Sequence, residues 1–147
     1  MAPDHLAHAP ASCFNWPVRV YYEDTDAGGV VFYANYLKFF ERARTEWLRA
    51  RGIHQHDLLQ SHGVVFVVKR CGIDYHAPAR LDDELNITAV VERVGRASVQ
   101  FQQQAWRMNG EQRLLCAAQV QVVCVDGASF RPCPIPENVL QSITTPD

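Results

Sequence analysis

The pattern of apolar and polar positions divides the first half of the chain into one strand and two helices. Apolar side chains alternate with other residues over positions 17–22, which predicts a strand. From position 32 to position 51 the apolar side chains recur every three to four residues, as in an amphipathic helix. Gly52 is a suitable stop for this helix. A second, shorter helix is expected over positions 56–61.

The second half of the chain predicts a meander of four strands. They cover positions 64–75, 85–94, 99–105 and 118–124, and a terminal helical turn follows at 137–143. Asn109-Gly110 is a strong hairpin signal between the last two strands. This order predicts an α+β domain in which the long helix lies across the concave face of a curled antiparallel sheet. The long open edges of such a sheet favour dimerisation through an edge strand.

Composition and charge exclude several classes of protein. The chain has 147 residues, 48% of them hydrophobic and 20% charged, and a net charge of -2, so neither nucleic acid nor an anionic membrane is an expected partner. Positions 1–15 contain no Lys or Arg and no apolar segment, so we expect a disordered tail, not a signal peptide, before a domain over 16–143. The longest apolar run, 64–68, is too short for a membrane span.

Five cysteines, without any C-x-x-C pair, indicate a reducing compartment. We therefore expect a cytoplasmic protein.

The densest candidate chemistry lies between the first strand and the long helix. Here the sequence runs Tyr-Glu-Asp-Thr-Asp-Ala-Gly-Gly-Val-Val-Phe-Tyr over positions 22–33. Asp24 and Asp26 have the spacing of side chains on one side of an extended segment. Gly28 and Gly29 leave backbone amides accessible, and the helix that follows adds its positive end. A carboxylate beside such amides can attack a carbonyl, or activate water, while the amides hold the oxyanion.

Two other interpretations of the aspartates remain open from the residues alone. An Asp-x-Asp metal site lacks a third ligand at a recognisable spacing, and His54, His56 and His62 do not share one helical face. Capping of a turn and of the next helix is common for Asp-Thr-Asp-x-Gly.

A serine or cysteine nucleophile is poorly supported, because no G-x-S-x-G motif is present. On the helix, Glu41 and Arg44 have the spacing of a surface ion pair.

The motifs Y-x-D-T-D-x-G-G-V-V and Y-x-x-x-x-E-R-A-R-T-E, within positions 18–50, resemble those of acyl-CoA thioesterases of the hotdog fold. The similarity is strongest to the 4-hydroxybenzoyl-CoA thioesterase group and its Tol–Pal-associated, YbgC-like branch. It continues through positions 75–83 and 122–126. The resemblance implies a curled antiparallel sheet of five to six strands wrapped around one long central helix. It also implies pairs of active sites at the interface of a homodimer, or of a homotetramer built from dimers.

By position, the resemblance makes Asp26 the catalytic carboxylate, as nucleophile or as general base. The amides around Gly29 and Tyr33 would polarise the thioester carbonyl, each donor contributing about a hundred- to a thousandfold in rate. Relatives often carry a histidine where this chain has Tyr33, so the role of that side chain stays open. The candidates for binding the substrate, chiefly the phosphates of CoA, are Arg96, Ser98 and Arg80. No metal or cofactor is implied.

The leading hypothesis is therefore hydrolysis of acyl-CoA thioesters to a free carboxylic acid and CoA. The alternative is a non-catalytic module that binds acyl-CoA or an acyl carrier protein and works with the cell-envelope machinery. A hotdog dehydratase ranks last, because it needs a histidine paired with a carboxylate and positions 33–51 contain no histidine. The acyl chain is not fixed by the sequence.

Overall fold

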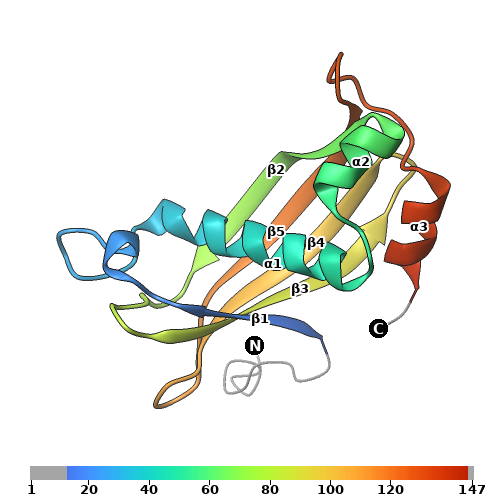
Figure 1. The fold of residues 1–147 in the computed structure, drawn as a ribbon. Helices are drawn as coiled ribbons and strands as arrows, with labels where there is room; N and C mark the ends of the chain where they lie inside the picture. Colours follow the sequence, from blue (N-terminus) through green and yellow to red (C-terminus); the bar gives the residue numbers. More distant parts are fainter. Residues whose placement is uncertain (1–12, 146–147) are drawn as a thin grey trace.

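A single curled sheet, with a long helix across its concave face, forms the body of the computed structural model, which describes residues 13–145 (Figure 1). The five strands are antiparallel, in the order β1-β3-β4-β5-β2. They are β1 (Phe14–Arg19), β2 (Val64–Tyr75), β3 (Glu84–Val94), β4 (Ser98–Arg107) and β5 (Arg113–Asp126). The helices are α1 (Tyr36–Ala50), α2 (Gln55–His62) and α3 (Glu137–Thr144). The predicted α+β architecture is thus confirmed.

Several predicted boundaries differ from the structure, and three of them concern where an element begins. The long helix begins at Tyr36 and not at position 32, because Tyr33–Asn35 form a separate 3-10 turn. β5 begins at Arg113, where it pairs with Arg107 across the hairpin. β1 begins at Phe14, which pairs with Ala89 of β3. Of the expected tail, residues 1–12 lie outside the described residues, whereas Phe14 and Asn15 belong to the sheet.

The helix and the sheet bury a shared apolar core. Phe39, Phe40 and Ala43 of α1 are fully buried, and they share one hydrophobic cluster with inward-facing residues of the strands, such as Leu85 and Ile87 of β3. Each large apolar side chain buried in this way stabilises the fold by about 1.5–3 kcal/mol. The core therefore fixes α1 against the sheet, and with it the loop that leads into the helix.

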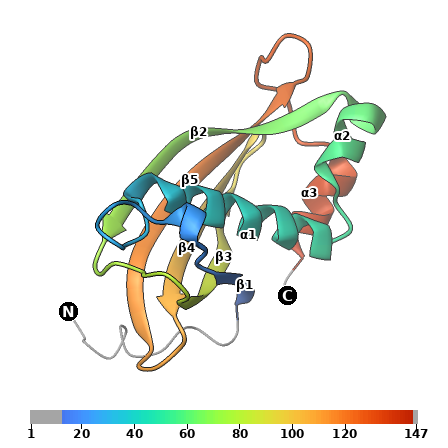
Figure 2. The ribbon, with the colours of Figure 1, turned by 60° about the vertical axis from the view of Figure 1, so that its left-hand side comes forward.

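The sheet has two edges, β1 and β2, and they differ in length. β2 has 12 residues and β1 has six, and β2 contains a register shift between Val68 and Arg70. Figure 2 shows β2 along one border of the sheet. Within residues 13–145, one side of β2 pairs with β5 and the other has no strand beside it. An unpaired edge of this length is a template for another strand.

No helix within residues 13–145 is both long enough and apolar enough to span a membrane.

Candidate active site

Residues 25–31, which carry Asp26, form a small hairpin between β1 and α1. Thr25 pairs with Val31, and the Asp26 N–H donates to the Val30 carbonyl at 2.9 Å. Gly29 turns the chain with a φ of 80°, a conformation that costs little only for glycine. Val30 and Val31 are fixed to the next segment, since Val30 pairs with Arg80 and the Val31 N–H donates to the Ala79 carbonyl. The hairpin is therefore held from both sides.

The two aspartates have different environments, so the prediction that they share one side is wrong. Asp24 closes a 3-10 turn and is only 6% exposed. One of its oxygens accepts from Asn35 Nδ2 at 2.9 Å, and the other accepts from the Tyr21 N–H at 2.8 Å. Asp26 is exposed, and its Oδ1 accepts from the Gly28 N–H at 2.8 Å. Capping thus accounts for Asp24 in full and for one oxygen of Asp26. The second oxygen of Asp26 accepts no hydrogen bond from residues 13–145.

The Gly29 N–H, which the resemblance implied would polarise the thioester carbonyl, is engaged inside the hairpin. The Gly29 N–H donates to the Asp26 carbonyl at 3.0 Å, so in this conformation it does not point to a ligand. Tyr33 and Ala34 are different, because they open the 3-10 turn and the first amides of a helical turn have no acceptor within it. Between the Asp26 hairpin and α1, the amides without an internal acceptor are therefore those at the start of this turn.

A cavity of about 330 Å³ lies beside Tyr33. The Tyr75 hydroxyl donates to the Tyr33 carbonyl at 2.7 Å, and the Tyr36 hydroxyl accepts from the Ala79 N–H at 3.0 Å. Burial raises the pKa of Tyr36 to about 12, so its hydroxyl keeps its proton at neutral pH. The lining is mostly aromatic and apolar: Val31, Tyr33, Tyr36, Tyr75, His76, Ala77 and Pro78. Sequence analysis did not assign Tyr75 to the site, although it opens the second segment of the resemblance.

The three candidate substrate-binding residues do not lie together. The backbone of Arg80 pairs with that of Val30 in the Asp26 hairpin, and the Arg80 side chain is exposed. Arg96 is exposed in the turn between β3 and β4, and Ser98 opens β4. The Asp26 hairpin and the Arg96 turn lie at opposite ends of β3 (Figure 1). Eleven residues of strand separate them by roughly 35 Å.

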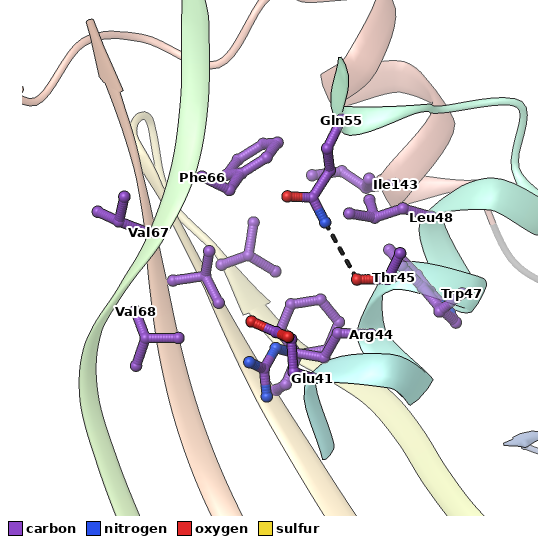
Figure 3. A pocket seen from close by; sticks show the side chains of 13 residues that line it. Glu41, Arg44, Thr45, Trp47, Leu48, Gln55, Phe66, Val67, Val68 and Ile143 are labelled. Atoms are coloured by element: carbon purple, nitrogen blue, oxygen red, sulfur yellow. Dashed lines mark hydrogen bonds between the residues drawn. The ribbon is translucent and has the colours of Figure 1, made fainter. Parts of the chain in front are cut away.

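A second, larger cavity lies between the C-terminal half of α1 and β2, and is called the α1–β2 cavity below. Its volume is about 380 Å³. Figure 3 shows Phe66 and Val68 of β2 facing Glu41, Arg44 and Thr45 of α1. The predicted surface ion pair between Glu41 and Arg44 is wrong, because Arg44 is only 9% exposed and donates to Gln103 Oε1 at 2.8 Å.

No group of three or more His, Cys, Asp or Glu side chains in the described part of the chain could hold a metal ion.

The model of the thioesterase-like superfamily matches residues 20–143. This range contains the Asp26 hairpin, α1 and β2. The chain belongs to this superfamily. It is 47% identical over 127 residues to the acyl-CoA thioester hydrolase YbgC of Escherichia coli O6:H1, covering 86% of this chain and 92% of that protein. It is 48% identical over 126 residues to the acyl-CoA thioesterase YbgC of Haemophilus influenzae, covering 86% and 90%.

A solved structure of a 4-hydroxybenzoyl-CoA thioesterase variant, in complex with 4-hydroxybenzoyl-CoA, has the same fold as this member of the thioesterase-like superfamily. The TM-score is 0.83 at 21% sequence identity, over 91% of this chain and all of that one. The hotdog fold and the resemblance to thioesterases are thereby confirmed.

Proposed function

We propose that the protein hydrolyses acyl-CoA thioesters, with Asp26 as the catalytic carboxylate and the amides of Tyr33 and Ala34 as oxyanion donors. The observation that carries the proposal is the Asp26 hairpin. It holds an exposed carboxylate, with one oxygen unengaged, just before a turn whose first amides have no internal acceptor. The names of the YbgC relatives support the acyl-CoA part of the proposal.

In the proposed reaction Asp26 either attacks the thioester carbonyl carbon or takes a proton from an attacking water molecule. The carbonyl oxygen becomes negative and accepts hydrogen bonds from the two amides. The carbon–sulfur bond then breaks, and CoA leaves as the thiolate and is protonated. In the general-base route the acid forms directly, whereas in the nucleophilic route water must first hydrolyse the anhydride between the acyl group and Asp26. A single turnover in ¹⁸O-labelled water tests the first route, because label found in Asp26 by mass spectrometry requires a covalent intermediate.

The test of the function is hydrolysis of a panel of acyl-CoAs, from short to long chains and including one aryl thioester. We expect turnover of part of the panel, followed by the loss of thioester ultraviolet absorbance. Binding of acyl-CoA without turnover would instead favour the non-catalytic binding module. An acyl carrier protein thioester, assayed beside the CoA thioester of the same chain, shows which carrier the site accepts.

The separation of Asp26 from Arg96 supports a site shared between two copies of the chain. We propose a homodimer in which β2 pairs with β2 of the partner about a two-fold axis. α1 crosses the concave face of the sheet (Figure 2), so the two α1 helices would run antiparallel. The Asp26 hairpin of one protomer would then approach the opposite end of the other, where the α1–β2 cavity and the Arg96 turn lie.

Val68→Glu is expected to convert this dimer into a monomer. Val68 is on β2, 49% exposed, and a charge near a two-fold axis meets its own copy, so that like charges repel. Sedimentation equilibrium should give twice the 16.6 kDa chain mass for the wild type and the single mass for the variant. Val90→Glu is the matched control, since Val90 is 43% exposed but lies on β3, inside the sheet. A Val68→Glu protein that stays dimeric would contradict pairing through β2.

Arg96→Ala is expected to raise the KM for acyl-CoA about tenfold, with little change in kcat, because it removes a charge-assisted bond to a phosphate. Steady-state kinetics on acyl-CoA, and on the acyl-N-acetylcysteamine thioester that lacks the nucleotide, measures the effect. Only the CoA substrate should respond. Arg93→Ala is the control, because Arg93 is an exposed arginine three residues away on β3. An equal effect of the two variants would remove Arg96 from the proposed site.

A further inference from the structure

Arg44 is a buried cation without an anionic partner. It is 9% exposed, and it forms no ion pair with a carboxylate of residues 13–145, where the pairs are Arg19–Glu84 and Arg49–Glu46. Its one acceptor is the neutral amide of Gln103. Burial lowers the pKa of Arg44, and the charge of Glu41 partly offsets this. Charges buried in proteins are paired or bind a ligand, so the missing anion needs an explanation.

The guanidinium is fixed in place and opens to the α1–β2 cavity. Gln103 is 1% exposed, and its Nε2 donates to the carbonyls of Phe40 and Thr88 at 3.0 and 3.2 Å. This leaves Gln103 Oε1 aimed at Arg44 Nη1. Every fully buried side-chain nitrogen and oxygen of the described residues has a hydrogen-bond partner. The Arg44 N–H groups that do not contact Gln103 are therefore not fully buried, and Arg44 is among the residues that line the cavity.

Two groups act on Arg44 through their charge, Glu41 and Cys71, but neither forms an ion pair or a hydrogen bond with it. Burial raises the pKa of the Cys71 thiol although Arg44 opposes this, so the thiol stays neutral at pH 7. Glu41 is exposed to water, and Figure 3 shows its carboxylate at the side of the cavity near the guanidinium. The opposite wall, from the sheet, is apolar and consists of Phe66, Val68, Val99, Phe101 and Val122. The cavity thus combines one buried cation with an apolar surface.

We propose that the α1–β2 cavity binds a carboxylate carried on an apolar chain, with the carboxylate on Arg44 and the chain against the sheet wall. Within the proposed function, on which this second step rests, the ligand has two sources. One is the free acid that hydrolysis releases. The other is the distal carboxylate of a dicarboxylic acyl group that is still attached to CoA. The chemistry recognised by Arg44 is the same in both.

Binding of octanoate and of octan-1-ol to the full chain tests the proposal without turnover. Trp47 lines the cavity and is 3% exposed, so 8-bromo-octanoate should quench its fluorescence, and calorimetry gives both affinities. Octanoate should bind about tenfold more tightly than octanol, in line with a charge-assisted bond. Arg44→Gln should remove this preference and leave octanol unchanged. Equal affinities in the wild type, or a preference that survives Arg44→Gln, would overturn the proposal.

A second variant keeps the proposal testable if Arg44→Gln does not fold. Glu41→Gln removes the competing carboxylate at an exposed position, so octanoate should bind several-fold more tightly, and unchanged or weaker binding would count against the site. Because octanoate binding needs no turnover, failure of the cavity to bind it is distinguished from failure of acyl-CoA hydrolysis, on which the proposed function depends. Kinetics distinguishes the two sources of the carboxylate. A higher kcat/KM for suberoyl-CoA than for octanoyl-CoA identifies the distal carboxylate of a dicarboxylic acyl group. Inhibition by octanoate without that preference identifies the released acid.

Discussion

Asp26→Asn is expected to lower kcat/KM for acyl-CoA hydrolysis about a thousandfold, because the amide is neither a nucleophile nor a base for water. Stability should hardly change. The side-chain oxygen of asparagine still accepts from the Gly28 N–H, and the position is exposed. The assay follows thioester ultraviolet absorbance, since exposed protein thiols such as Cys71 react with thiol reagents.

The control for Asp26→Asn is Glu23→Gln, which neutralises an exposed carboxylate three residues upstream and should keep wild-type activity. An Asp26→Asn enzyme with full activity would exclude both proposed roles of the carboxylate. Loss of activity together with a large fall in melting temperature would point to a structural role and leave the catalytic one without support.

Asp24→Ala should have the opposite profile, with a loss of about 3 kcal/mol in the free energy of unfolding and a loss of activity that follows from it. The substitution leaves the buried Asn35 Nδ2 without its acceptor, at about 1–3 kcal/mol, and also removes the acceptor of the part-buried Tyr21 N–H. Urea unfolding followed by tryptophan fluorescence measures the change. Asp24 thus positions the hairpin, and Asp26 performs the proposed chemistry.

Thr25→Ala is the comparison for Asp24→Ala within the same turn. Its hydroxyl donates to the Tyr22 carbonyl at an exposed site, where water replaces the lost partner, so the cost should stay below about 1 kcal/mol. If Asp24→Ala cost no more than Thr25→Ala, the buried carboxylate would not be what holds the hairpin.

Periodicity predicted the elements of this fold because each of them buries one face. The apolar residues that alternate in β3 and that recur every three to four residues in α1 are the ones that face the shared core. The boundaries were less accurate where the contact is not apolar. Because Tyr33–Asn35 form a 3-10 turn, α1 begins later than its apolar pattern predicts. Asn35 in this turn donates to the carboxylate of Asp24, eleven residues earlier.

The sequence proposes candidate site residues but not how they are arranged. Asp24 and Asp26 have similar sequence neighbours, but Asp24 is buried and bonded to Asn35 and to the Tyr21 N–H, whereas Asp26 is exposed. Arg44 has the spacing of a surface residue, yet Gln103, 59 residues further along the chain, draws it inwards. The distance between the Asp26 hairpin and Arg96 depends on the course of β3. Such relations follow from tertiary contacts, which no local pattern encodes.

α1 is attached at two points, to the segment between β2 and β3 and to β4 of the sheet, and this limits how the protein can evolve. Tyr36 is bound to Ala79 through its hydroxyl, and the Phe40 carbonyl is bound to Gln103. One residue inserted between these points would turn the rest of the helix by about 100° and shift it by about 1.5 Å, which would move Arg44 out of reach of Gln103. Selection should therefore remove insertions and deletions in this helix among descendants of the gene. Their acyl preferences would diverge through side-chain exchange, while length variation accumulates in the surface loops.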